Sequence, residues 1–220
     1  MKKFIVLFGL VTTPYLFSDY TYSIKNISPD IKKRMIDGDS WRKGCPVRLN
    51  DLRYIQVSYR DFQAKTQTGE LVMHKDVAKD IVAIFKELYR LDYPIWQMGL
   101  VSDFSSSDYQ SIEADNTSAF NCRKVTEGQK WSKHAYGLAI DINPIENPYL
   151  KKGKHSSHKK SLKYEKRVHQ NPTDPHDRAL LLKDDKATQV FIKHGWEWGG
   201  DWKHIKDYQH FQKKVTSHKK

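Results

Sequence analysis

Cysteine is scarce in this sequence, because Cys45 and Cys122 are the only two among 220 residues. They do not form a Cys-x-x-Cys pair, so a thiolate zinc site of that kind is excluded and a zinc ion would have to use histidine and carboxylate ligands. In an exported chain the two cysteines could form one disulfide. The alternative is two separate thiols.

Long apolar runs are also rare. Met1-Lys2-Lys3 precedes an apolar run from Phe4 to Leu10, and this arrangement resembles a secretory signal. We therefore predict a signal peptide over residues 1–23 and an exported protein, either periplasmic or associated with the cell envelope. A small-x-small cleavage site is missing, and the alternatives are a buried first strand or an uncleaved anchor. No second apolar segment reaches the roughly 20 residues of a spanning helix, so we expect no stable membrane insertion after signal removal.

Acidic residues are outnumbered 26 to 38 by lysine and arginine, which gives a net charge of +12. Such a balance favours polyanionic partners, including nucleic acid, an anionic surface or an acidic polymer. A nucleic-acid-binding protein would interleave aromatic side chains with Lys and Arg on one surface. The sequence has no compact basic helix and its tryptophans gather near Trp196 to Trp202, so we expect no nucleic-acid partner.

The remaining pattern predicts one α+β domain over residues 24–220. Apolar spacing predicts a helix over 74–91, begun by Asp76, and a second helix over 185–194. Alternation predicts a strand over 52–59. The sequence also predicts a turn from Thr66 to Glu70 around Gly69, a loop over 102–118, strands over 138–142 and 208–215, and a long exposed basic loop or flap over 151–178.

Two stretches contain the candidate metal-binding and catalytic residues. The first, Ser132 to Pro144, contains His134 and Asp141 with Gly137 between them, where a bend or a close approach of the backbone is expected. The second contains Asp207 and His210. Two imidazoles and one carboxylate form the usual protein half of a catalytic zinc site, and the remaining carboxylate could act as a base.

Alternatives exist for these residues. His134 and Asp141 could be ordinary polar residues at a strand end, and His210 could be a core histidine. On an ideal strand, Asp207 and His210 would face opposite sides, so a turn or bulge at Lys206-Asp207 is needed to bring both to one site. The other histidines are expected not to be ligands, although His204 neighbours the second motif: His74, His155, His158, His169, His176, His194, His204 and His218.

The two motifs read Ser132-x-His134-x-x-Gly137-x-Ala139-x-Asp141 and, later in the chain, Asp207-x-x-His210. They resemble those of the VanY-type D-alanyl-D-alanine carboxypeptidases. That family of M15 zinc peptidases also includes VanX-like dipeptidases and phage endolysins that cut L-Ala–D-Glu bonds. The sequence is most similar to the subgroup that uses Asp where VanX-like enzymes use Glu. The resemblance covers about residues 50–215.

The resemblance implies a Hedgehog/DD-peptidase-like fold with a central antiparallel sheet and flanking helices. It implies one Zn²⁺ per chain bound by His134, Asp141 and His210, with Asp207 as the catalytic base. Arg123 matches an arginine that holds the substrate or stabilises the oxyanion. Ser132 matches a serine that contacts the substrate or orders the site.

We therefore expect a zinc metallopeptidase that hydrolyses peptidoglycan stem peptides, as a D-Ala-D-Ala carboxypeptidase. One alternative is an L-Ala–D-Glu endopeptidase of the same fold. Another is a non-catalytic zinc-bound module that binds the cell wall.

Overall fold

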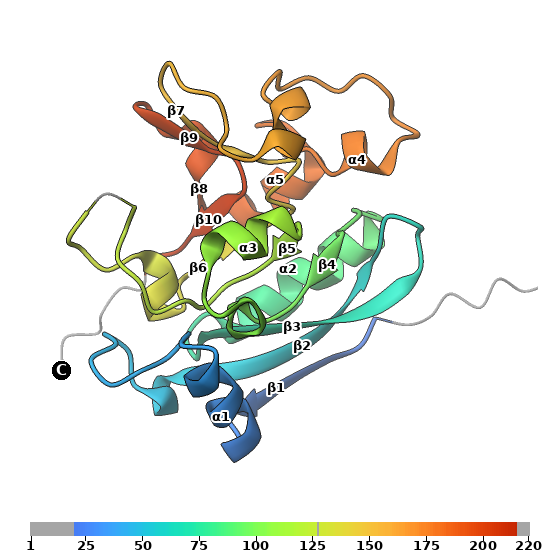
Figure 1. Cartoon of the computed structure of the whole chain (residues 1–220). Coiled ribbons are helices and arrows are strands. Elements are labelled where there is room, and N and C mark those ends of the chain that lie inside the picture. Colours follow the sequence, from blue (N-terminus) through green and yellow to red (C-terminus); the bar gives the residue numbers. More distant parts are fainter. Residues whose placement is uncertain (1–19, 127, 215–220) are drawn as a thin grey trace, which may run out of the picture.

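The computed structural model describes residues 20–126 and 128–214 (Figure 1). The predicted signal peptide lies outside these residues except at its end, where Tyr22 and Ser23 belong to the first strand. The α-helices are α1 (Pro29–Asp37), α2 (Ala78–Arg90), α3 (Asp108–Glu113), α4 (Pro175–Arg178) and α5 (Lys186–Lys193). The strands are β1 (Tyr22–Asn26), β2 (Leu52–Arg60), β3 (Thr66–His74), β4 (Gln97–Met98), β5 (Asn116–Thr117), β6 (Ala139–Asp141), β7 (Tyr149–Lys151), β8 (Glu197–Trp198), β9 (Ile205–Asp207) and β10 (His210–Gln212). Short 3₁₀ turns are η1 (Leu49–Asp51), η2 (Val101–Phe104), η3 (Lys133–Tyr136), η4 (Lys159–Tyr164) and η5 (Gly199–Asp201).

The first sheet is an antiparallel meander in the order β1-β2-β3. β2 confirms the predicted strand. The predicted turn around Gly69 is wrong, because Thr66 to Glu70 belong to β3. The chain turns earlier, where Oδ1 of Asp61 accepts hydrogen bonds from the backbone of Gln63 and Lys65. A glycine is needed inside β3 because the side chain of Met98 occupies the space a Cβ would take.

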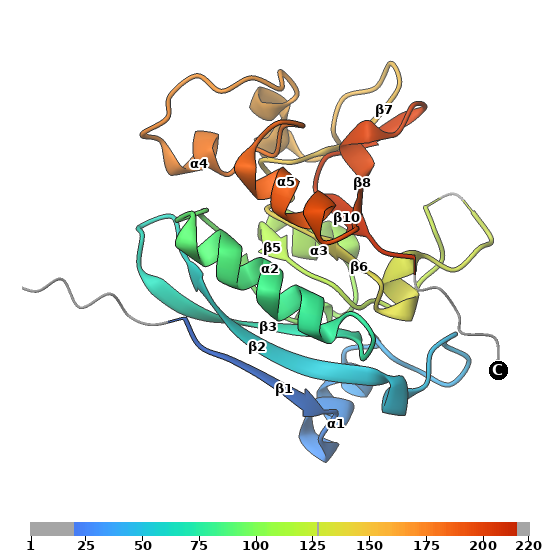
Figure 2. The same cartoon turned by 180° about the vertical axis from the view of Figure 1, so that it is seen from behind.

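Helix α2 confirms the helix predicted over 74–91. Its apolar stripe of Ile81, Ile84, Phe85 and Leu88 is buried. Asp76 does not cap it, because the helix begins after Val77 without a side-chain cap. The helix lies across the first sheet and also contacts α5, so it separates that sheet from the C-terminal half (Figures 1 and 2).

Residues 102–118 do not form the predicted loop. They contain η2, α3 and β5. Ser107 begins α3, because its hydroxyl accepts a hydrogen bond from the backbone N–H of Gln110 at 3.2 Å. Serine-rich composition therefore marks a helix start here. Strand β5 then pairs in parallel with β4.

A second antiparallel sheet has the order β6-β10-β8, and β7 pairs with β9 beside it. The α+β class is confirmed. The single central sheet is wrong: the described residues form four small sheets, which are the two three-stranded antiparallel sheets, the parallel pair β4-β5 and the antiparallel pair β7-β9. Strands of both three-stranded sheets pack into one hydrophobic core with α2 and α5. Helix α5 confirms the helix predicted over 185–194. Within residues 20–126 and 128–214, no helix has the length and apolarity that crossing a bilayer would require.

A disulfide joins Cys45 to Cys122, with a Cα–Cα distance of 5.8 Å. The first of the two alternatives for the cysteines is therefore confirmed. Cys122 is fully buried, and its backbone N–H donates to the carbonyl of Ser40 at 3.0 Å. The bond fastens the segment that precedes Arg123 to the N-terminal part of the chain.

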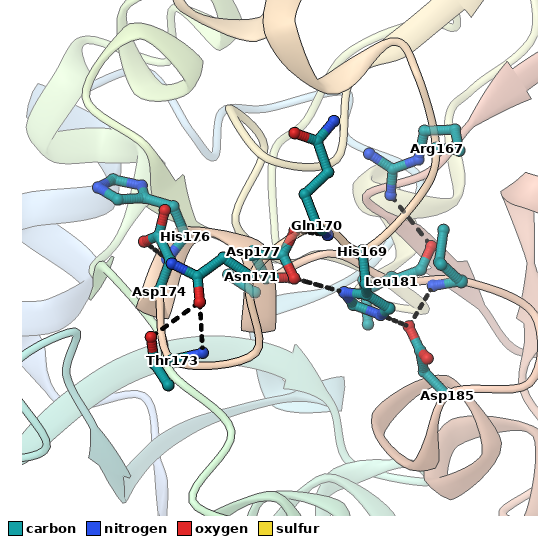
Figure 3. A network of polar contacts seen from close by, with 12 residues as sticks. Arg167, His169, Gln170, Asn171, Thr173, Asp174, His176, Asp177, Leu181 and Asp185 are labelled. Atoms are coloured by element: carbon teal, nitrogen blue, oxygen red, sulfur yellow. Dashed lines mark hydrogen bonds and ion pairs between the residues drawn. The ribbon is translucent and has the colours of Figure 1, made fainter.

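The basic segment 151–178 carries exposed lysines, but it is not the simple exposed loop that the sequence predicts. It includes η4 and α4, and His158, Ser161 and Tyr164 are buried. Arg167 holds it inward through hydrogen bonds to the carbonyl of Glu146 and to the carbonyl of Leu181. Figure 3 shows the bond to Leu181. Because every residue has a backbone carbonyl, the local sequence does not indicate which carbonyls an arginine will bind.

Candidate metal site

The first ligand candidate, His134, lies on η3. The hydroxyl of Ser132 caps this turn by accepting from the backbone N–H of His134 at 3.3 Å. Gly137 ends it with φ +67°, and a Cβ at this position would lie 2.6 Å from the backbone nitrogen of His74. Both roles predicted for Gly137, a bend and a close approach, are confirmed. The bend directs the chain into β6, which ends at Asp141.

The second sheet brings the two motifs together. His210 and Asp141 are register partners on the antiparallel strands β10 and β6. Asp207 and His210 belong to two different strands, β9 and β10, joined by Tyr208 and Gln209. A turn between Asp207 and His210 is therefore present, but it lies at Tyr208-Gln209 and not at Lys206-Asp207 as predicted, because Lys206 and Asp207 belong to β9.

The metal-ligand atoms of three side chains converge in the interior. Nε2 of His134 lies 3.2 Å from Nδ1 of His210 and 3.3 Å from Oδ2 of Asp141. Nδ1 of His210 lies 3.0 Å from Oδ1 of Asp141. Tetrahedral zinc with ligands at about 2.0–2.2 Å places neighbouring donor atoms about 3.3–3.6 Å apart, close to these separations. Among the described residues, no other group of three His, Cys, Asp or Glu side chains offers ligand atoms this close together.

The hydrogen bonds of the cluster support a cation. Nδ1 of His134 donates to the backbone carbonyl of Ala119, which leaves the lone pair of Nε2 directed at His210 and Asp141. Burial opposes ionisation of Asp141, but His134 and His210 outweigh it and lower the pKa of this carboxyl below its usual range. Burial likewise opposes protonation of His210, while Asp141 raises its pKa overall. The donor set therefore fits Zn²⁺.

Asp207 lies beside the cluster without joining it. Burial raises the pKa of this carboxyl to about 6, the positive field of His210 opposes the shift, and Asp141 adds to it. Its Oδ1 atom is buried and has no hydrogen-bond partner within the described part of the chain. Gly199 allows the preceding turn to approach, because a Cβ there would lie 2.5 Å from the carbonyl oxygen of Asp207. A carboxyl with one unpartnered oxygen and a raised pKa is suited to general-base chemistry.

The structure does not bring Arg123 into contact with the cluster. Its guanidinium forms an ion pair with Asp108 and donates to the carbonyl of Lys124 at 3.1 Å. Its backbone carbonyl accepts from the N–H of Ser132, so Arg123 lies on the segment next to η3. No sequence motif indicates Asp108 as a partner of Arg123, because Asp108 precedes Arg123 by 15 positions and lies within a polar stretch.

A family model described as D-alanyl-D-alanine carboxypeptidase matches residues 126–213. The matched region includes Ser132, all three residues of the cluster and Asp207, whereas Arg123 precedes it. Neither the curated proteins nor the solved structures include a match to this chain.

Proposed function

We propose that this protein is a zinc-dependent peptidase of peptidoglycan stem peptides, because its residues 126–213 match the M15 peptidase family model described as D-alanyl-D-alanine carboxypeptidase. The observation that carries the proposal is the convergence of His134, Asp141 and His210 within the matched region. A hydrolase of this family would meet its substrate in the cell envelope, so export of the protein is part of the proposal.

One zinc ion per chain would be held by His134, Asp141 and His210. Bound there, zinc would supply Lewis-acid polarisation of the scissile carbonyl and lower the pKa of a water molecule towards roughly 7. Asp207 would accept the proton of the attacking water and deliver it to the leaving amine nitrogen. Burial raises the pKa of Asp207 to about 6, which is nearer to neutral pH than the pKa of an ordinary carboxyl.

Arg123 and Ser132 would have different roles. Arg123 would hold the terminal carboxylate of the substrate or stabilise the oxyanion, and Asp108 would orient its guanidinium. Ser132 would order the site, since its hydroxyl is already engaged with the backbone of His134. The buried, unpartnered Oδ1 atom of Asp207 next to the cluster favours a catalyst over a binding module that only holds zinc.

We propose D-Ala-D-Ala carboxypeptidase activity as the specific reaction. The test is to incubate the zinc-loaded protein with a stem pentapeptide ending in D-Ala-D-Ala and to identify the products by mass spectrometry. Loss of a single D-Ala is expected. Cleavage between L-Ala and D-Glu would instead establish the endopeptidase alternative. An intact pentapeptide after incubation with fully loaded protein would contradict both activities.

A further inference from the structure

The hydrogen bonds of His210 continue from the cluster to the protein surface. His210 and Gln212 are two residues apart on β10, so their side chains leave the same face of the sheet. Nε2 of His210 lies 3.3 Å from Oε1 of Gln212, and Nε2 of Gln212 lies 3.0 Å from Oε2 of Glu197. Glu197 is the register partner of Gln212 on β8, and its other oxygen lies 2.7 Å from Nζ of Lys214.

The chemistry of these groups gives the chain of contacts a direction. Hydrogen bonds from Lys214 and Gln212 lower the pKa of Glu197, so its carboxyl is ionised at neutral pH and can only accept. The amide nitrogen of Gln212 must therefore donate to Glu197, which turns the amide oxygen towards His210. That oxygen is also only an acceptor, so it requires an N–H at Nε2 of His210.

A proton at Nε2 of a neutral imidazole leaves the lone pair at Nδ1. Nδ1 is the atom of His210 that lies 3.0 Å from Asp141 and 3.2 Å from His134. We infer that Gln212, oriented by Glu197, is a positioning residue that holds His210 in the tautomer able to bind the metal ion. The inference rests on the proposed zinc site and names side chains outside the donor set that control its affinity.

The two histidines of the cluster differ in this respect. His134 is oriented by the backbone carbonyl of Ala119, which substitution of a side chain does not remove. Within the described part of the chain, the hydrogen bonds that the structure shows for the His210 ring are to side chains, and those on its Nε2 side continue through Gln212 to the half-exposed Glu197 and to Lys214. The orientation of His210 is therefore open to direct test by mutation.

The test compares variants by zinc affinity, measured on metal-free protein in competition with a chromogenic chelator. Gln212→Leu removes the acceptor and should weaken zinc binding by about 10–100-fold, the usual effect of losing a partner behind a ligand. The double variant Glu197→Gln with Gln212→Glu keeps the total charge and returns a carboxylate acceptor to His210, so it should bind zinc at least as tightly as the wild type. Gln189→Leu on α5 is the matched control, because the side-chain amide of Gln189 donates to the carbonyl of Lys183 and is not part of the cluster.

A second readout separates orientation from general damage. Nitrogen-15 spectra of histidine-labelled, metal-free protein should place the His210 proton on Nε2 in the wild type and the double variant, at a pH where the ring is neutral. Gln212→Leu should give a mixture of tautomers. Melting curves in EDTA verify that each variant is folded.

Two results would overturn the inference. One is zinc affinity of wild-type strength in folded Gln212→Leu, and the other is a double variant that binds as weakly as Gln212→Leu. If Gln212→Leu does not fold, the double variant and Glu197→Ala still test the inference. Glu197→Ala frees the amide of Gln212 to rotate, so it should lose less zinc affinity than Gln212→Leu is expected to lose. Absence of stoichiometric zinc from the wild type would contradict the proposed function instead.

Discussion

At the scale of single residues, the cluster depends on which ring nitrogen each histidine turns inward. His134 presents Nε2 because its Nδ1 donates to Ala119, and His210 presents Nδ1. The sequence predicts His134, Asp141 and His210 as one group from residue type and motif. It does not predict Ala119, because a backbone carbonyl has no residue-type signature. Strand periodicity indicates that Gln212 shares a face of the strand with His210, since it lies two positions beyond His210.

Substitution of a ligand candidate should remove the metal ion. His134→Ala leaves only two donors, so metal analysis of the purified protein should show far less than one zinc per chain. His204→Ala is the matched control, because His204 neighbours the second motif but does not belong to the cluster. Its zinc content should remain at the wild-type value. Equal zinc in both variants would contradict the ligand assignment.

At the scale of elements, segment 151–178 shows which structural features a local sequence pattern predicts and which it does not. Its composition predicts an exposed loop, and all of its lysines except Lys151 are exposed. Each of its four histidines nevertheless pairs with a carboxylate: His155 with Glu165, His158 with Glu113, His169 with Asp177 and Asp185, and His176 with Glu146. Glu113 and Glu146 lie far from their histidines in the sequence. Such pairs depend on the completed fold, which explains why the sequence does not predict them.

His169 should make this segment sensitive to pH. Its Nδ1 lies 3.1 Å from Asp177 and its Nε2 lies 3.0 Å from Asp185 (Figure 3). Burial lowers the pKa of His169, but the two carboxylates outweigh it and raise the pKa overall. A neutral ring has one N–H and cannot donate to both carboxylates. The stabilisation should therefore be complete below the unfolded pKa of about 6.5 and be lost as pH rises through the folded value.

Hydrogen exchange of this segment measures the effect against His169→Gln, which does not titrate. Protection in the wild type should exceed that in the variant at pH 6. The difference should shrink as the pH is raised. A difference that stays constant with pH would show that His169 acts only through its shape.

At the scale of the whole molecule, the two three-stranded sheets share one core with helices α2 and α5, and the disulfide spans 77 positions from the N-terminal part to the segment beside η3. The sequence allows this bond but leaves it open, because the proximity of two cysteines so far apart depends on tertiary structure. The net charge of +12 also belongs to this scale. It favours encounter with an anionic cell wall.

Removal of the disulfide should lower global stability. The double variant Cys45→Ser with Cys122→Ser should lose about 2–4 kcal/mol of unfolding free energy, because the unfolded chain regains conformational freedom. Urea unfolding at equilibrium measures the change. A reducing agent should destabilise the wild type towards the variant and leave the variant unaffected. Equal midpoints for oxidised wild type and variant would contradict a stabilising role.

The central claim is that a zinc site and a separate general base act together, and Asp207→Asn tests it most directly. The substitution keeps the size of the side chain and leaves His134, Asp141 and His210 in place. Zinc content and stem-peptide cleavage are measured on the same preparation. The account predicts about one zinc per chain and a fall in turnover of about 10²–10⁴-fold, the range for a lost acid–base group. Full activity in Asp207→Asn would contradict the account, and loss of zinc would show that Asp207 is a ligand.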